Sequence, residues 1–395
     1  EPQPAVLRAA GERGVPLHAG AGERKVSGRL PDGTPVRVVE TARDGGWLRV
    51  RAGDGTEGWV VARYVQLDTP SAENAPPSLP AGLPEDFPLP GGACPTAIPD
   101  PAAKLAEAPV EDQAEIDSAA SAPPGGRLVV ASYNLWELYD GRDGDRYLGD
   151  EHAEAARLGE AGHTARRVET LGGALRAAAP HVLVLQEVEN AELACAVAHA
   201  AVPEAGWRCW AAAWAREPHP QNVAVASRVG GEAVRLDPGR GMGQRGALEW
   251  TLPGGDLRVA AVHLTSSVGA AGAEDCDNAR KRMSLAWGLA QRQAAIPAGA
   301  YLVIGDFNVD PADPLKVEYD RTDDILARAG DQDLLERAPG VAPAGAPRRA
   351  GSVIDRAWLR PGAGVEAAGV EFLDRAPRRG WASDHVPLVV ELRLP

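Results

Sequence analysis

Several polar side chains of the kinds that bind metal ions or transfer protons occur where apolar runs of this sequence end. They are Asn134, Glu187, His263, Asp306, Asn308, Asp355, Asp384 and His385. A single residue of this kind is usually a turn or a cap. So many residues of ligand or acid–base type predict instead one site to which several strands contribute.

The oxygen-donating side chains of this set suit a hard divalent cation. Mg²⁺ prefers oxygen ligands and keeps several of its waters, so one or two carboxylates suffice to hold it. Glu187, together with Asn134 and Asp384, is therefore the predicted metal site. Mg²⁺ is the expected ion, and Mn²⁺ or Ca²⁺ are the alternatives.

The histidines of the set suit proton transfer. A histidine beside a carboxylate can take a proton from water near neutral pH, and His385 oriented by Asp355 fits that role. A second histidine, His263, can donate a proton or a hydrogen bond to a phosphate. Together with a metal ion, these groups are the equipment for metal-assisted hydrolysis of a phosphate ester.

Strands and helices alternate along the part of the chain that carries these residues. Apolar and β-branched runs predict strands at 127–136, 181–188, 223–227, 257–264, 301–305, 352–359 and 386–394. Helical periodicity predicts helices at 166–179 and 276–295. Hairpin-like strand pairs also occur, which favours a mixed α/β sandwich over a purely parallel sheet.

Six short motifs follow one another in this region: SYNLW, LQEVEN, VHLTS, IGDFN, IDRAWL and SDHVPL. In this order they resemble the endonuclease/exonuclease/phosphatase superfamily, whose members include pancreatic-type deoxyribonuclease, abasic-site endonucleases, sphingomyelinases and inositol-polyphosphate phosphatases. The resemblance covers residues 127–395. It implies a four-layer α/β/β/α sandwich with the active site at one edge of the paired sheets.

The resemblance also implies roles for the residues in the motifs. Glu187 would be the main metal ligand, with Asn134 beside it. Asp306 would orient or activate the attacking water, and Asn308 would contact the scissile phosphate. Asp384 would support a metal ion or the second histidine.

The two histidines receive roles in the same way. His385 with Asp355 would form a dyad that acts as a base or binds phosphate. His263 stands where the deoxyribonuclease-like branch has its second histidine. Members of the superfamily differ in which group is the base, and both readings of the dyad stay open at this point.

Three further residues are candidates for substrate binding. Asn222 precedes the strand VAVAS, where relatives place a polar group that contacts phosphate, and ordinary capping is the alternative. Arg245 and Arg280 carry forked guanidinium groups that suit phosphate. For Arg280 a solvated helix face is the alternative.

The N-terminal part of the chain has a different pattern. Short β-type runs separated by Gly- and Asp-containing turns occupy residues 1–70, and residues 13–67 resemble a bacterial SH3-like domain, a small all-β barrel. The resemblance implies a cell-wall peptide or a protein as ligand, and a packing module without a ligand is the alternative.

Residues 71–126, rich in Pro, Ala and acidic residues, predict a linker, with a short helix at 101–107 or 110–118. The catalytic domain would then occupy 127–395.

Charge, cysteines and hydropathy restrict how the protein can attract a substrate and in which compartment it is expected. The formal net charge is −14, so metal ions or a local arginine patch must attract any polyanionic substrate. The four cysteines can pair as Cys195 with Cys209 and Cys94 with Cys276, or remain four thiols. No apolar run is long enough to span a membrane. The chain begins without Met, and we expect a secreted or periplasmic bacterial protein whose signal peptide has been removed.

The predicted function is a divalent-metal-dependent phosphodiesterase, an endonuclease that acts on DNA. The insertion 137–155 and the motif LQEVEN resemble bacterial extracellular nucleases, and acidic groups of the insertion either bind Ca²⁺ or form a solvated loop. One alternative is a phosphatase or a sphingomyelinase-like phospholipid phosphodiesterase, for which Trp207, Trp210 and Trp214 are candidates for an exposed aromatic hairpin. A further alternative is an inactive scaffold that binds cell wall.

Overall fold

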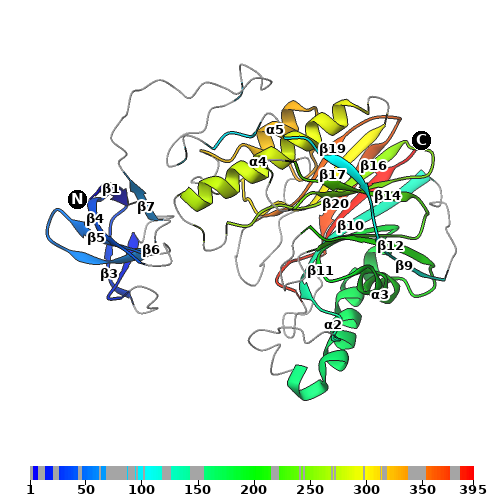
Figure 1. The fold of residues 1–395 in the computed structure, drawn as a ribbon, viewed down its shortest axis with the longest axis horizontal. Helices are drawn as coiled ribbons and strands as arrows, with labels where there is room; N and C mark the ends of the chain where they lie inside the picture. The colour runs from blue at the N-terminus through cyan, green and yellow to red at the C-terminus, as the bar shows by residue number, and fades with distance from the viewer. Residues whose placement is uncertain are drawn as a thin grey trace.

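The computed structural model of the 395-residue chain (Figure 1) describes residues 3–7, 14–20, 26–42, 47–61, 64–67, 87, 94, 97–100, 103–117, 126–142, 155–214, 222–239, 242, 245–267, 270, 273–296, 299–311, 313, 318–336, 353–373 and 383–395. Residues 143–154, which make up most of the acidic insertion, lie outside the described residues.

The N-terminal region forms an all-β unit. Its strands are β1 (Gln3–Leu7), β2 (Val15–His18), β3 (Val26–Leu30), β4 (Pro35–Thr41), β5 (Trp47–Ala52), β6 (Glu57–Val61) and β7 (Val65–Leu67). They form one sheet in the order β3-β2-β6-β5-β4-β1-β7, around a small core that includes Leu7, Val15, Val50 and Val60. The all-β fold predicted for this region is confirmed.

Two seven-stranded sheets form the centre of the rest of the described chain. The first has the order β20 (Glu366–Phe372), β21 (Leu388–Arg393), β10 (Arg127–Leu138), β11 (Val182–Val188), β13 (Asn222–Ser227), β12 (Trp207–Ala212) and β9 (Asp112–Ile116). The second has the order β18 (Gln332–Asp333), β19 (Asp355–Arg360), β17 (Ala300–Asp306), β16 (Leu257–His263), β15 (Ala247–Thr251), β14 (Glu232–Asp237) and β8 (Ala106–Pro109). Each sheet has a parallel pair at its centre, β10 with β11 and β16 with β17.

Helices cover the outer face of each sheet. The helices are α2 (Glu160–Leu175), the short 3₁₀ helix η3 (Arg176–Ala178), α3 (Ala191–Ala201), α4 (Ala273–Ala294) and α5 (Thr322–Arg328). Side chains of α2 and α3 pack on the first sheet, and side chains of α4 and α5 pack on the second. A third core, with Val184 and Ile304 among its residues, fills the space between the sheets. The predicted four-layer α/β/β/α sandwich is therefore confirmed.

The alternation of side chains along the strands explains these layers. In β11, Val182 and Val184 pack between the sheets, whereas Leu183 and Leu185 pack against α2 and α3. A strand that buries both faces has to be apolar along most of its length. The continuous apolar run that ends at Glu187 is therefore the sequence signature of a central strand.

The described residues between 87 and 116, namely 87, 94, 97–100 and 103–116, lie against the sandwich, and we call them the strap. Phe87, Cys94 and Ala103 are buried in the core beside α4. Strand β8 then pairs antiparallel with β14 at the edge of the second sheet, and β9 pairs antiparallel with β12 at the edge of the first. The helix predicted at 101–107 or 110–118 is wrong. The Ala- and Glu-rich composition favours a helix, but unpaired backbone groups of two sheet edges impose strand pairing instead. The predicted division into 1–70, 71–126 and 127–395 stays a prediction.

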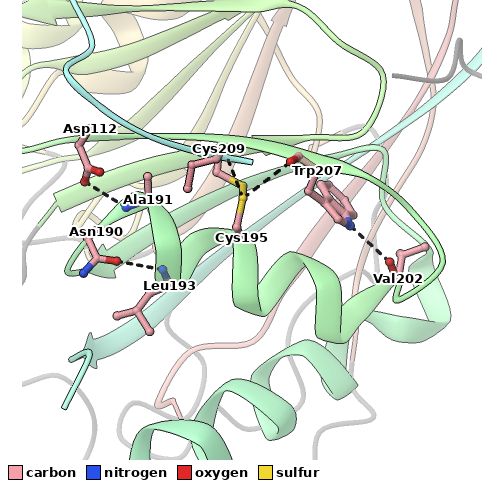
Figure 2. Close-up of a disulfide and its surroundings, with 9 residues drawn as sticks. Asp112, Asn190, Ala191, Leu193, Cys195, Val202, Trp207 and Cys209 are labelled. Carbon is pink, nitrogen blue, oxygen red and sulfur yellow. Dashed lines mark hydrogen bonds between the residues drawn. A yellow bond between two sulfur atoms is a disulfide. The ribbon is translucent and has the colours of Figure 1, made fainter. Parts of the chain in front are cut away.

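Both cysteine pairs form disulfides. Cys94 joins the strap to Cys276 in α4, and Cys195 in α3 joins Cys209 in β12. Figure 2 shows the second disulfide beside the first turn of α3, where the Asn190 side chain accepts a hydrogen bond from the Leu193 amide (2.9 Å). There the Asp112 carboxylate of the strap also accepts one from the Ala191 amide (3.0 Å). The structure therefore has the predicted pairing, and the alternative of four free thiols is wrong.

Within the described residues, no helix is both long and apolar enough to cross a membrane.

Replacing Cys94 and Cys276 together by serine should lower the free energy of unfolding by about 2–4 kcal/mol, because a cross-link that closes a long loop constrains the unfolded chain. The two cysteines are 182 residues apart in sequence. Urea-induced unfolding under non-reducing conditions, followed by circular dichroism, measures the change. Each single replacement removes the same cross-link, so both single variants should match the double variant. Additive losses would show that side-chain packing, and not the cross-link, provides the stability.

Candidate active site

Three candidate residues form one row across neighbouring strands of the second sheet. His263 at the end of β16 pairs in register with Asp306 at the end of β17, and Asp306 pairs with Asp355 at the start of β19. Because side chains alternate along a strand, Asp306 faces the same way as Ile304, into the space between the sheets. Gly305 stands between these two residues, where an added Cβ would lie 2.0 Å from the Val262 carbonyl oxygen. The row therefore depends on a glycine at this position.

Asn134 connects this row to the first sheet. Asn134 lies on the same face of β10 as Val130, which packs between the two sheets. The residue is only 1% exposed. Its Nδ2 donates hydrogen bonds to Glu187 Oε1 (3.1 Å) and to Asp306 Oδ2 (3.0 Å). One amide group thus joins a carboxylate of each sheet.

Glu187 reaches the site because β11 is irregular at this residue. Simple alternation would point its side chain toward the helices, on the side of Leu185. The register between β11 and β13 instead shifts between Gln186 and Val188, and Glu187 has a positive φ of 58°. This bulge turns the carboxylate toward Asn134. Bulges often re-aim a side chain at an active site.

The donor set fits a hard cation that keeps most of its water. No cluster of three or more His, Cys, Asp or Glu side chains suited to a metal ion occurs in the described part of the chain. Glu187 and Asp306 nevertheless place two carboxylates around one amide, and burial raises the pKa of Glu187. A divalent cation would stabilise the charged form of such a carboxylate. Glu187 is the residue best placed to hold it, because Asn134 Oδ1 already accepts a hydrogen bond from the Trp136 amide (3.0 Å).

His385 and Asp355 form the predicted dyad. His385 Nδ1 lies 2.7 Å from Asp355 Oδ2, and its Nε2 points into the site, 3.7 Å from Asp306 Oδ2 and 3.9 Å from Asp384 Oδ1. Burial alone would lower the pKa of His385, but the carboxylates of Asp355, Asp306 and Asp384 outweigh burial and raise it to about 10. The ring is therefore a cation in the metal-free site, which suits binding of a phosphate.

Asp306 has the electrostatics of a base. Burial raises its pKa to about 7, with repulsion from Asp355 adding to the effect, although His385 and hydrogen bonds from Asn308 and Asn134 favour the charged form. The Asn308 amide N–H donates to Asp306 Oδ1 (2.8 Å), and the Asn308 side chain donates to the Leu264 carbonyl (2.9 Å). A pKa close to neutral pH suits a group that takes a proton from water.

His263 is a neutral ring in these surroundings. It is 2% exposed, and its Nε2 lies 3.6 Å from Glu187 Oε1 and 3.7 Å from Asp306 Oδ2. Burial, and then the positive charges of Arg245 and His385, lower its pKa well below 6.5. A neutral imidazole can donate one hydrogen bond without adding charge.

The structure brings one of the three substrate-binding candidates into the site. Arg245 lies close enough for its charge to act on His263. Burial lowers the pKa of Arg245, and the charges of Glu187 and Asp306 partly oppose this effect. The Asn222 side chain donates to the Glu189 carbonyl (2.7 Å), next to the Glu187 bulge. The Arg280 side chain forms an ion pair with Asp277 on its own helix α4 (2.5 Å). The roles of all three in substrate binding stay predictions.

Sequence reasoning missed two residues that support the site. Ser383 Oγ donates to the Asn134 carbonyl (2.6 Å) and accepts from the His385 amide (3.0 Å), so it connects β10 to the residue of the dyad. Its signal was present, because it is the first residue of the SDH motif. Arg167 of α2 was the second, and its signal was the helical spacing that places it on the same face as Leu171 and Leu175, whereas its neighbour Arg166 is exposed.

Comparison with known families follows the two regions of the fold. A model described as the Endonuclease/Exonuclease/phosphatase family matches residues 131–385, and a model described as the Bacterial SH3 domain matches residues 13–66. The chain belongs to the endonuclease/exonuclease/phosphatase family. Members of this family are hydrolases of phosphodiesters or phosphate esters, and they generally use divalent metal ions. Both predicted resemblances are confirmed.

Several solved structures are similar to this endonuclease/exonuclease/phosphatase family chain. An AP endonuclease from Archaeoglobus fulgidus is 16% identical with a TM-score of 0.48, over 67% of this chain and 98% of the other. The 3′ phosphatase NExo from Neisseria, bound to a product DNA hairpin, is 20% identical with a TM-score of 0.44, over 67% and 98%. TDP2 from C. elegans is 16% identical with a TM-score of 0.44, over 68% and 76%. No curated protein matches the sequence.

The raised pKa of Asp306 predicts a dependence of stability on pH. Asp306 titrates at about 7 in the folded protein but near 3.9 in an unfolded chain. As the pH falls from about 6.5 to about 4.5, the folded form takes up a proton here before the unfolded chain does, which stabilises the folded form. The metal-free protein should therefore gain stability relative to an Asp306→Asn variant over this range. Each unit of pKa difference corresponds to about 1.4 kcal/mol.

Urea unfolding of both proteins in EDTA measures this difference. His385 is protonated in both the folded and the unfolded state below about pH 6.5, so it contributes little to the slope. Histidines outside the site are common to both proteins and cancel. A stability difference that stays constant over the pH range would show that the Asp306 carboxyl is not perturbed.

Proposed function

We propose that the protein is a divalent-metal-dependent phosphodiesterase that cleaves DNA. The observation that carries this proposal is the arrangement around Asp306, a buried carboxyl whose pKa of about 7 is close to neutral pH. Asn134 holds it beside Glu187, and the rings of His263 and His385 lie within 4 Å of it. A base, a cation-binding carboxylate and two donors to phosphate are thereby gathered around one point.

The residues divide the work of hydrolysis among themselves. Asp306 orients the attacking water and takes its proton. His385, held at Nδ1 by Asp355, directs its Nε2–H to a phosphate oxygen, and neutral His263 donates to a second oxygen. Of the two readings of the dyad, phosphate binding fits the raised pKa of His385 better than a base does.

The remaining charges on the phosphate need further donors. Asn308 uses one amide hydrogen for the Leu264 carbonyl and has a second for the scissile phosphate. Arg245 adds a guanidinium group near Glu187. Glu187, with the predicted help of Asp384, would hold a divalent cation, which would supply positive charge to the phosphate and to the leaving oxygen. Mg²⁺ is the proposed ion, because the available ligands are few and all oxygen.

The three tryptophans considered for a lipid-binding hairpin do not support a lipid substrate. Trp207 and Trp210 are each 1% exposed and belong to the core, and Trp214 donates a hydrogen bond to Asp237 (3.1 Å). These residues do not form the exposed aromatic hairpin that a phospholipid phosphodiesterase would use. The motif LQEVEN and the acidic insertion, which resemble extracellular nucleases, support DNA.

A secreted or periplasmic location is part of the proposal. Two disulfides use all four cysteines of the chain. Disulfides persist in oxidising compartments and are rare in the cytosol. A ligand of the SH3-like region, either a cell-wall peptide or a protein, would then retain the enzyme near the cell surface.

Plasmid DNA incubated with the protein and Mg²⁺ or Mn²⁺ should be nicked, and EDTA should stop the reaction. Glu187→Ala and His385→Ala should each lower the rate by about 10²–10⁴-fold, because each removes a group that acts on the phosphate or its cation. Agarose gel electrophoresis of the relaxed plasmid measures the rate, and circular dichroism checks that each variant is folded.

Matched substrates decide between the alternatives. Release of phosphocholine from sphingomyelin, or of phosphate from inositol phosphates, with DNA left intact would assign a different substrate to the same site. If the folded protein cleaves none of these substrates with any of the metals, the scaffold alternative replaces the enzyme.

A further inference from the structure

The backbone that follows Asn134 departs from strand geometry. Trp136 and Glu137 both have positive φ angles, 52° and 53°. Residues with large side chains rarely adopt this left-handed conformation, and it persists only where the surroundings impose it. The register between β10 and β11 is interrupted over the same residues, between Asn134 and Leu138. Something other than the sheet must hold this segment, which we call the 135–137 turn.

The 135–137 turn orients Glu187, which would bind the cation, and Asn134, which lies beside it. Its Trp136 amide donates to Asn134 Oδ1 (3.0 Å), and its Glu137 amide donates to Glu187 Oε2 (3.1 Å). Both amides point at the site because the two residues are left-handed. A relaxed strand would aim successive amides in opposite directions.

Arg167 of α2 binds the other side of this turn. Its guanidinium group donates to the carbonyl oxygens of three consecutive residues. The distances are 2.7 Å to Leu135, 2.8 Å to Trp136 and 3.0 Å to Glu137. One turn earlier in α2, Thr164 Oγ1 donates to the Tyr139 carbonyl (2.9 Å). The side chain of Arg167 is buried, and the residue is only 4% exposed.

A charged residue at this helix position needs an explanation. Arg167 precedes Leu171 by four residues and Leu175 by eight, so it lies on the helix face that packs on the first sheet. An apolar side chain would satisfy the packing there. It would leave the three carbonyl groups of the turn without their donor, and a buried guanidinium is costly unless such partners pay for it. The fork of Arg, with five N–H donors in one plane, suits three neighbouring carbonyls as the single ammonium of Lys does not.

We propose that Arg167 is a positioning residue for the cation site. It holds the 135–137 turn in its left-handed conformation, and the turn in turn fixes the oxygens of Asn134 and Glu187. Groups that orient metal ligands from behind typically change metal affinity about 10–100-fold when they are removed. The inference rests on the proposed function, because it takes Glu187 to be the residue that holds the cation.

Binding of Mn²⁺, followed by the loss of its free electron paramagnetic resonance signal, tests this role without any substrate. Arg167→Met keeps the packing and removes the donors, so it should weaken Mn²⁺ binding about 10–100-fold. Arg167→Lys keeps the charge but not the fork, and it should bind with an intermediate affinity. Arg166→Met, which changes the exposed neighbour on the same helix, is the matched control and should bind as the wild type does.

The outcomes distinguish failure of the positioning role of Arg167 from failure of the proposed cation site at Glu187. Arg167→Met that is folded by circular dichroism and binds Mn²⁺ within about twofold of the wild type would overturn the positioning role. If that variant does not fold, Arg167→Lys decides: an affinity equal to that of the wild type assigns Arg167 to folding alone. Glu187→Gln serves as the reference. If it leaves Mn²⁺ binding unchanged, the proposed cation site is wrong, whereas a loss in Glu187→Gln without a loss in Arg167→Met refutes only the positioning role.

Discussion

One buried amide group connects the two sheets of the sandwich at the candidate active site. Asn134 comes from the first sheet, and its Nδ2 donates to Glu187 of the same sheet and to Asp306 of the other. Two carboxylates that accept hydrogen bonds from the same nitrogen lie close enough to repel each other, and the repulsion is strong in an interior of low dielectric. The amide places two positive hydrogens between them. The geometry of the site is therefore set by how the two sheets stack, which the apolar residues between them decide.

The candidate site buries polar groups, which costs free energy, among apolar side chains whose burial stabilises the fold. Asp306, Asp355 and His263 are each less than 10% exposed, and within the described residues His263 Nδ1 and Asp355 Oδ1 have no hydrogen-bond partner. Polar groups buried in this way cost free energy. Strands β16 and β17, which end at His263 and Asp306, are mostly apolar before these residues, and the packing of their apolar side chains offsets the cost.

The sequence predicted the parts of the site that regular strands deliver. His263, Asp306 and Asp355 end or begin apolar runs, and alternation with a period of two places Asp306 on the same face as Ile304. Glu187 was found by its position after such a run, but alternation gives it the wrong face, because the bulge in β11 has no signal in a single sequence. Arg167 was missed for a related reason. Its role depends on three carbonyl groups of a distant turn, and backbone groups leave no mark on the sequence.

The strap has a consequence for where this protein can be divided. The match to the family begins at residue 131, and the strap precedes it. Yet the strap contributes an edge strand to each sheet, a covalent link to α4 and a carboxylate to the first turn of α3. The strap therefore binds to both sheets and to helices α3 and α4, which are elements that lie far apart in the sequence. A fragment cut at the family boundary would keep every candidate catalytic residue and expose two sheet edges, which invites association between chains. A fragment that keeps both edge strands and the Cys94–Cys276 disulfide in place would therefore have to include the strap.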